Sequence, residues 1–447
     1  MDKKDTKISN RWIIVIGAIM IQLALGAIYA WSAFTTPLQG TEGAISEFAF
    51  NKTQTQAIFS AGLASFAIFT IIGGRLSKKY GPRKIAFLGG LLLGLGYILS
   101  SFVGANFPLK LLFIGIIGGA GIGLAYVIPI AVGVKWFPDK KGLVSGLAVA
   151  GFGFGAFIWI LLANPPSVFG FNGLISMSTG NAVNGQQFAY TILNVDSIFR
   201  LYGIAFLVLV VIGSLVMINP PEGWKPKNWK EKEEKTNKEK ISKSLLPKEM
   251  LRTRHFYLLW LMFCIGALAG LMVIGNIQNF AKNPMDGFIG HGFSSEEAVD
   301  FAVIGAAVCL PIFNGIGRIV WGQISDKIGR KKALISMFIF QGITMIIFFY
   351  TTSNPYFFYV FAALIGFNFG GNFALFPVAT ADSFGLENVG LNYGFIFTSY
   401  GVGGIFGPIL AGAVQDAGMS FLYAFIPAAI MCFIAAFLAL IYKSKAN

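Results

Sequence analysis

The stretch GGRLSKKYGPRK, residues 73–84, returns in the second half of the chain as WGQISDKIGRKK, residues 321–332. The two stretches align without a gap at an offset of 248 residues, which pairs Gly74 with Gly322. Other pairs at this offset are Gly81 with Gly329, Pro129 with Pro377, Gly142 with Gly390, Gly146 with Gly394, Gly153 with Gly401 and Gly155 with Gly403. Because prolines, glycines and a basic loop agree at one offset, we predict two repeats in parallel orientation.

The chain as a whole is far more apolar than a soluble domain. Of its 447 residues 55% are hydrophobic and 12% are charged, whereas soluble domains carry about 25% charged residues. Twelve apolar segments of about 20 residues each are long enough to span a bilayer. We therefore predict an all-α membrane protein of twelve transmembrane helices in two parallel six-helix pseudo-repeats. Residues 1–218 and 255–447 form the halves, and residues 219–254 form a basic linker between them.

The net charge of +14 could indicate nucleic-acid binding, but the placement of the cations indicates membrane topology. Nearly all of the 34 Lys and Arg residues fall in the tails, the linker and the loops of one side. On the other side lie only Lys52, Lys110, Arg200 and Lys282, and Arg318 alone lies within a predicted helix. By the positive-inside rule we expect both termini in the cytoplasm. We expect a monomer in the cell membrane, surrounded by lipid, and no nucleic-acid partner.

The loop GQISDKIGRKK, residues 322–332, resembles the signature loop of the major facilitator superfamily, which joins helices 2 and 3 and recurs between 8 and 9. The resemblance implies the major facilitator fold. In that family the Asp and the basic residues of the loop latch the cytoplasmic side, a role that falls here on Asp326 and Arg330. Lys78 occupies the Asp position of the first copy, so we do not expect the first copy to form this latch. Cytoplasmic cations bounded by turn glycines would also explain most of both loops.

Arg318 lies inside the apolar run FNGIGRIVWGQ, residues 313–323, eight residues before Asp326. That spacing is about 12 Å along a helix, which places Arg318 near the midplane of a core about 30 Å thick. All 20 Asp and Glu residues fall in loops, tails or helix ends, so we expect no buried carboxylate beside it. An anion that comes and goes would satisfy such a cation, and the guanidinium fork suits a carboxylate. Snorkelling toward the cytoplasm and bonding to helix carbonyls are the alternatives.

Polar and aromatic side chains at similar depth are candidate companions of Arg318. Tyr29 and Tyr126 could donate to a carboxylate while their rings exclude solvent, and Asn314 lies one turn before the arginine. Asn372 and Tyr400 lie at similar depth in the tenth and eleventh predicted helices. Each of these residues, taken alone, is more often an interhelical hydrogen bond than a ligand contact.

Three segments resemble the oxalate/formate antiporter family, a branch of the superfamily that neighbours the monocarboxylate transporters. They are QLALGAIYAWSAFTTPL at 22–38, NGIGR at 314–318 and NYGFIFTSYG at 392–401. The resemblance covers nearly the whole chain apart from the linker and an insertion at 164–197. It implies that Arg318 binds the substrate carboxylate, with Tyr29 and Tyr126 as aromatic residues of the site.

Two departures from the relatives narrow this expectation. The oxalate carrier of the family has a lysine in helix 11, whereas Phe397 to Gly401 contains no cation, so oxalate is disfavoured. The animal monocarboxylate carriers place an Asp one turn before the arginine, where this chain has Asn314. Any coupled proton would therefore travel on the substrate carboxyl or on another group.

We predict a secondary transporter that binds a small monocarboxylate, such as lactate, pyruvate, glycolate or formate, on Arg318 and moves it by proton-linked alternating access. The alternatives are an exchanger of oxalate, formate or another organic anion, and a sensor that binds a carboxylate without moving it. An enzyme is not predicted, because no His, Cys, Asp and Glu constellation forms a catalytic or metal centre. The three cysteines lack metal-type spacing, and we expect neither a metal nor a cofactor.

Overall fold

The computed structural model describes residues 10–31, 34, 37–38, 50, 52–163, 173–174, 194–221, 224, 226 and 244–442. Twelve helices in this part of the chain are long and apolar enough to cross a membrane. The prediction of an all-helical protein with twelve spans is confirmed. Most of the insertion at 164–197 and most of the linker lie outside the described residues.

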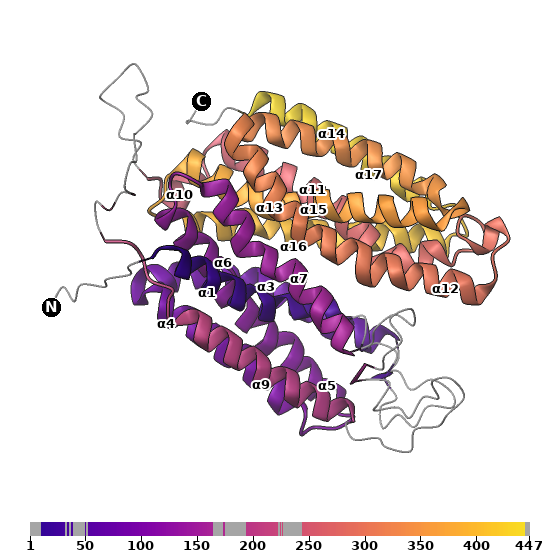
Figure 1. The fold of residues 1–447 in the computed structure, drawn as a ribbon, viewed down its shortest axis with the longest axis horizontal. Helices are drawn as coiled ribbons and strands as arrows, with labels where there is room; N and C mark the ends of the chain where they lie inside the picture. The colour runs from indigo at the N-terminus through magenta and orange to yellow at the C-terminus, as the bar shows by residue number, and fades with distance from the viewer. Residues whose placement is uncertain are drawn as a thin grey trace.

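The spans follow the two-half arrangement, with the first half drawn in indigo to magenta and the second in rose through orange to yellow (Figure 1). The helices of the first half are α1 (Trp12–Leu25) continued by η1 (Gly26–Trp31), α3 (Lys52–Tyr80), α4 (Pro82–Ser100), α5 (Phe107–Lys110) continued by η2 (Leu111–Gly118) and α6 (Gly119–Trp136), α7 (Lys141–Ala163) and α9 (Val195–Ser214). The helices of the second half are α11 (Arg254–Ala281), α12 (Ser295–Ile304) continued by η5 (Gly305–Cys309) and α13 (Leu310–Ile328), α14 (Arg330–Phe349), α15 (Pro355–Phe384), α16 (Val389–Asp416) and α17 (Leu422–Ile441). The short helix α10 (Pro247–Met250) lies at one end of the bundle and α12 at the other (Figure 1). We call the first of these the α10 end.

Two glycines of the repeated loop have the same backbone conformation. Gly81 separates α3 from α4 with a φ of 88°, and Gly329 separates α13 from α14 with a φ of 87°. Side chains rarely tolerate this left-handed region, so glycine is the residue that allows the abrupt turn. The repeat found in the sequence is therefore also a repeat in backbone geometry.

The halves meet along two seams that the repeat relates to each other. At the α7–α13 seam, a Cβ added to Gly142 would lie 2.3 Å from the carbonyl oxygen of Gly322. At the α3–α16 seam, a Cβ added to Gly74 would lie 2.7 Å from the carbonyl oxygen of Gly390. The offset of 248 converts one contact into the other, because it pairs Gly142 with Gly390 and Gly74 with Gly322. Glycine at these four positions lets the backbones of opposite halves touch.

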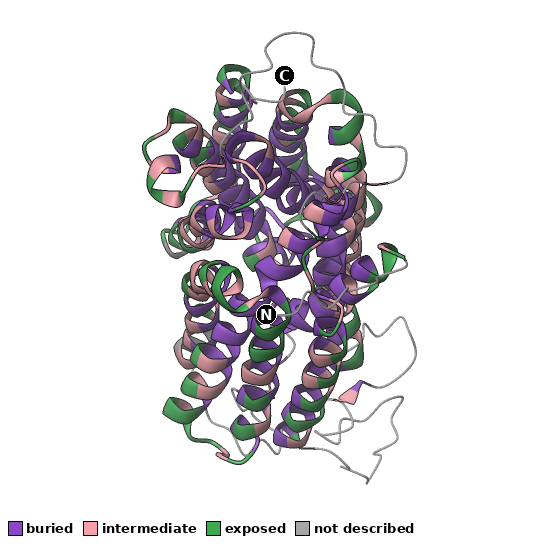
Figure 2. Cartoon of the chain, turned by 90° about the vertical axis from the view of Figure 1, so that its left-hand side faces the viewer, coloured by how far each residue is buried: buried purple, intermediate pink, exposed green. Residues whose placement is uncertain are grey.

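The outer faces of the helices remain apolar although they are exposed. On α17, for example, Tyr423 and Phe437 are each 61% exposed and Ile430 is 53% exposed. Buried residues gather along the inner faces of both bundles (Figure 2). An exposed apolar surface of this kind suits the hydrocarbon of a bilayer.

Two acidic residues that the sequence places in a loop or at a helix end are buried among the described residues. Asp196, 7% exposed, lies 2.6 Å from the buried ammonium of Lys110, which also donates to the carbonyl of Ser100. Asp286, 8% exposed, accepts a hydrogen bond from the backbone N–H of Phe421 just before α17. The sequence placed Lys110 and Asp196 at helix ends, but pairing allows both charges to be buried there.

Candidate functional site between the halves

Arg318 lies inside the protein at the α7–α13 seam and is 1% exposed. Its Nε donates to Asn314 Oδ1 at 2.9 Å, and its Nη1 donates to the backbone carbonyl of Val149 in the other half at 2.8 Å. Its Nη2 has no hydrogen-bond partner among the described residues. The bond to Val149 agrees in part with the alternative that Arg318 bonds to backbone carbonyls. It leaves the Nη2 group of the guanidinium without a partner among the described residues.

Aromatic rings enclose the guanidinium. Arg318 Cζ lies 4.3 Å from the ring centroid of Phe373 and 5.3 Å from that of Phe152, which are cation–π distances. Phe152 in turn packs edge-on against Tyr126, with ring centroids 5.7 Å apart. Rings of both halves therefore form the walls around the cation, and the sequence pattern had not identified Phe152 or Phe373.

Tyr29 and Tyr400, both predicted as site residues, connect the two halves through a hydrogen bond between their hydroxyls. Tyr29 lies on the 3-10 turn η1, and Tyr400 lies on α16. The change of helix type begins at Gly26, where an added Cβ would lie 2.2 Å from the carbonyl oxygen of Phe152. Their rings pack against the two phenylalanines beside Arg318, Tyr29 against Phe152 and Tyr400 against Phe373, with ring centroids 5.1 and 5.6 Å apart.

Two further tyrosines place their hydroxyls in the same space. Tyr126 is 1% exposed and Tyr393 is fully buried, and their hydroxyls lie near enough to interact with each other, although neither makes a hydrogen bond of standard geometry among the described residues. Both rings pack against Phe397 of α16, with centroids 4.9 Å away for Tyr126 and 5.7 Å away for Tyr393. Tyr393 was missed in the sequence, although it lies seven residues before Tyr400 and therefore on the same face of α16. Arg318 Nη2 and these two hydroxyls are therefore candidate donors to a bound acceptor.

Asn372 is placed differently from the other predicted site residues. Its amide lies against Gly266 of α11, where an added Cβ would be 2.3 Å from its Oδ1, and its Nδ2 donates to the carbonyl of Phe369. Asn314, by contrast, bonds directly to Arg318. The structure therefore brings the three predicted tyrosines together with Arg318 and Asn314, whereas Asn372 faces α11.

The side chain of the predicted latch residue Asp326 bonds to the opposite half at the α10 end. Its carboxylate accepts hydrogen bonds from the backbone N–H groups of Gly142 at 3.0 Å and Leu143 at 2.8 Å. These groups belong to the first turn of α7, and a helix N-terminus favours an anion. The contact joins the loop of the second half to a helix of the first.

Arg330, the second latch residue, extends the contact into a charge network. It bonds to Asp326 at 2.7 Å and to Asp382 of α15 at 3.0 Å. Lys141, in the first half, bonds to the same Asp382 at 2.7 Å. The sequence pattern had not identified Lys141 or Asp382, whose partners are far away in the chain.

The first copy of the loop also crosses between the halves, with its polarity reversed. Lys78 donates to Asn388 at 2.7 Å and to Glu387 at 3.0 Å, in the turn that precedes α16. Asn388 is itself held by the last part of the linker, because its Nδ2 donates to the carbonyl of Leu245. Lys78 thus forms a contact between the halves that we had not expected from the first copy of the loop.

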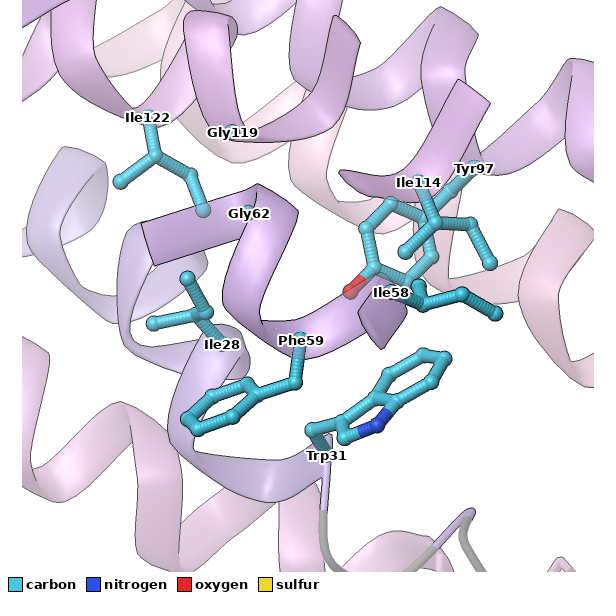
Figure 3. A pocket seen from close by; sticks show the side chains of 9 residues that line it. All are labelled: Ile28, Trp31, Ile58, Phe59, Gly62, Tyr97, Ile114, Gly119 and Ile122. Atoms are coloured by element: carbon cyan, nitrogen blue, oxygen red, sulfur yellow. The ribbon is translucent and has the colours of Figure 1, made fainter. Parts of the chain in front are cut away.

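A small cavity lies within the first half, under the turn that carries Tyr29. Figure 3 shows Ile28 and Trp31 of η1 on one side and Tyr97 of α4 on another. Its volume is about 20 Å³, and its lining is mostly aliphatic and aromatic. The cavity gives space beside η1 but is separate from the groups that surround Arg318.

The fold and the site define a class of membrane carriers built from two six-helix halves. The family model of the Major Facilitator Superfamily matches residues 12–288 and 283–447, and the chain belongs to this family. Over 97% of its length the chain superposes on the fucose transporter FucP in the outward conformation, with a TM-score of 0.65 at 15% identity and 99% of that chain covered. This likeness concerns the fold.

Relatives of the chain include transporters of known and unknown cargo. The oxalate:formate antiporter of Oxalobacter formigenes is 28% identical over 433 residues, which cover 96% of this chain and 90% of that protein. The apicoplast pyruvate carrier 1 of Toxoplasma gondii is 26% identical over 458 residues, covering 88% and 82%. An uncharacterized transporter of this superfamily, YhjX of Escherichia coli, is 28% identical over 398 residues, covering 89% and 86%.

Proposed function

We propose that the chain is a secondary transporter of a small monocarboxylate, such as lactate, pyruvate, glycolate or formate, whose carboxylate is held by Arg318. The observation that carries this proposal is the unpartnered Nη2 of a fully enclosed arginine. A buried cation of this kind is costly unless an anion pairs with it. A carboxylate can take two parallel hydrogen bonds from the guanidinium fork if it displaces a resident bond.

The neighbours of Arg318 favour a substrate with one negative charge. The neutral hydroxyls of Tyr29, Tyr126, Tyr393 and Tyr400 lie around Arg318 and can supply hydrogen bonds to a substrate but no second positive charge. The segment Phe397–Gly401 also lacks a cation. Tyr126 and Tyr393 can each donate to a carboxylate oxygen or to a neighbouring hydroxyl or keto oxygen, so a short 2-hydroxy or 2-keto acid uses both.

In this proposal the transporter works by alternating access, in which the contacts along the two seams open and close in turn. The half at 1–218 would rock against the half at 255–447, with the linker at 219–254 joining them, while Asp326, Arg330 and Lys78 hold the α10 end closed. We place the termini and the α10 end in the cytoplasm of a cell, with the chain in the cell membrane. A proton would enter with the substrate carboxyl, because Asn314 stands where the animal carriers have an acid.

Anion exchange is the second candidate function. An empty site retains a buried cation, and the relative from Oxalobacter formigenes is named as an antiporter. An exchanger would keep Arg318 neutralised through most of its cycle. A sensor that binds a carboxylate without moving it is the third candidate; the repeat and the paired loops favour a carrier, and a measurement of flux distinguishes the two.

Counterflow distinguishes these functions. The purified chain is placed in liposomes loaded with unlabelled L-lactate, and the entry of labelled L-lactate is followed with and without a pH gradient, with oxalate and formate as competitors. Labelled lactate that accumulates, and does so faster when the interior is alkaline, supports proton-linked monocarboxylate transport. Exchange of oxalate or formate without lactate uptake overturns the substrate assignment, and binding without any flux indicates a sensor.

A further inference from the structure

Three buried polar side chains of the second half carry atoms that lack hydrogen-bond partners among the described residues, at a place separate from the Arg318 site. The unpartnered atoms among the described residues there are Oε1 and Nε2 of Gln341, Oγ1 of Thr344 and Nδ2 of Asn368. Gln341 is 4% exposed, and Thr344 and Asn368 are each 1% exposed. Buried polar groups are almost always bonded to protein or to ordered water, so these atoms require a ligand.

Two side-chain contacts fix the register between α14 and α15, which run in opposite directions. Near the α10 end, the sulfur of Met337 lies 2.6 Å from the place where a Cβ on Gly371 would be. Further along, the rings of Phe348 and Phe358 are stacked with their centroids 5.5 Å apart. The surfaces between these two contacts must therefore face each other.

The unpartnered atoms lie between the two contacts. On α14, Gln341 follows Met337 by one helical turn, and Thr344 comes three residues later on the same face. On α15, Asn368 comes three residues before Gly371 and also shares its face. The antiparallel register sets Gln341 opposite Asn368, with Thr344 about one turn farther from the α10 end.

The orientation of the Asn368 amide is fixed by a neighbour. Its Oδ1 accepts a hydrogen bond from the indole Nε1 of Trp321 at 3.2 Å. Trp321 lies on α13, three residues after Arg318. Since the oxygen is occupied by α13, the Nδ2 donor remains for the side of α14.

We propose that α14 and α15 enclose a bound water molecule that bridges Gln341, Thr344 and Asn368. The ligand must accept a hydrogen bond from Asn368 Nδ2 and donate one to Gln341 Oε1, while the Thr344 hydroxyl can do either. Water meets these demands and typically makes about three bonds at such sites. The contacts that bound the site, Met337, Gly371 and Phe348, are uncharged, which favours a neutral ligand over an ion.

The water completes a chain of hydrogen bonds behind the candidate site. It supports the amide of Asn368, which holds the indole of Trp321 one turn away from Arg318. The bridge thus gives α14, which does not contribute to the Arg318 site, a part in positioning α13.

X-ray radiolysis followed by mass spectrometry tests this proposal on the full chain in lipid nanodiscs. Hydroxyl radicals form from water held inside a protein, and they oxidise a methionine sulfur beside it. Met337 is 1% exposed and lies next to the proposed water, whereas Met262 of α11 is fully buried and serves as the matched dry reference. We expect Met337 to be oxidised at least fivefold faster than Met262, and the variant Gln341→Leu/Thr344→Val to bring the two rates together.

Equal rates for Met337 and Met262 in the unaltered chain would overturn the proposal, and this comparison needs no variant to fold. A fast rate at Met337 that persists in a folded double variant would also overturn it, because the radicals would then come from elsewhere. A density map that shows a solvent peak within hydrogen-bond distance of Asn368 Nδ2 provides an independent positive result.

Discussion

Asp326 and Lys78 occupy equivalent positions in the two repeats, carry opposite charges, and both bond across the boundary between the halves. Asp326 accepts from the first amides of α7, and Lys78 donates to Asn388, the residue that precedes α16. The offset of 248 also relates α7 to α16. The repeat therefore keeps the place of the crossing contact while the chemistry of the contact is reversed.

Removing the carboxylate of Asp326 should loosen the α10 end. Asp326→Ala loses two hydrogen bonds to a charged group, each worth about 1.5–3 kcal/mol, so the closed arrangement should be populated at least tenfold less. We expect a correspondingly faster maleimide reaction at Ser145→Cys, one turn inside α7, in a chain without its native cysteines. Lys327→Ala, an exposed change in the same loop, is the control. Equal labelling in both variants would show that Asp326 closes nothing.

The two acceptors of Lys78 should contribute unequally. Lys78 and Glu387 are 51% and 67% exposed in their side chains, and such ion pairs contribute at most about 1 kcal/mol. Asn388 is 3% exposed and also bonds to Leu245, so Asn388→Ala should cost about 1–2 kcal/mol. Labelling of Thr70→Cys in α3 should rise about tenfold with Asn388→Ala and less than threefold with Glu387→Ala. The opposite order would assign the contact to the ion pair.

Tyr393→Phe should weaken substrate binding without destabilising the protein. Among the described residues its hydroxyl makes no hydrogen bond of standard geometry and only neighbours that of Tyr126, and a lost hydrogen bond to substrate is worth about 0.5–1.5 kcal/mol, or about two- to tenfold in affinity. Tyr202→Phe is the matched control, because the Tyr202 hydroxyl donates to the carbonyl of Trp159 inside the first half. That variant should lower the melting temperature and leave affinity unchanged. Unaltered affinity in Tyr393→Phe would remove this tyrosine from the site.

A methyl group at Gly146 should obstruct the α7–α13 seam. Its carbon would lie 2.2 Å from the carbonyl oxygen of Arg318, and overpacking of this kind costs about 1–3 kcal/mol. We expect counterflow in Gly146→Ala to slow tenfold or more. Gly412→Ala in α16, where an added Cβ meets nothing within 4 Å, should stay within twofold of the unaltered chain. Similar rates in both variants would show that the seam does not close during transport.

Local sequence patterns predicted the fold, whereas contacts between residues far apart in the chain could not be predicted from them. Hydropathy and the glycine repeat act through neighbouring residues, so the twelve spans could be predicted, and so could the placement of Arg318 within a helix. The bond from Arg318 to the carbonyl of Val149 uses backbone, which has no sequence signature. Asp382 meets Arg330 and Lys141 only after α7, α14 and α15 have packed together.

Tyr393 belongs to a different kind of omission. Its spacing of seven residues from Tyr400 indicated a shared helix face, and the pair could have been recognised together. The buried pair of Lys110 and Asp196 could not, because the two residues lie on different helices, and each alone reads as an ordinary charged residue at a helix end.

Binding of labelled L-lactate to the purified chain tests most directly whether Arg318 holds a carboxylate. The unaltered chain, Arg318→Lys and Arg318→Gln are compared by scintillation proximity after each variant is confirmed to be folded and monodisperse. Loss of the bidentate fork predicts affinity at least tenfold weaker in Arg318→Lys and no measurable binding in Arg318→Gln. A folded Arg318→Gln that binds lactate as tightly as the unaltered chain would contradict the account.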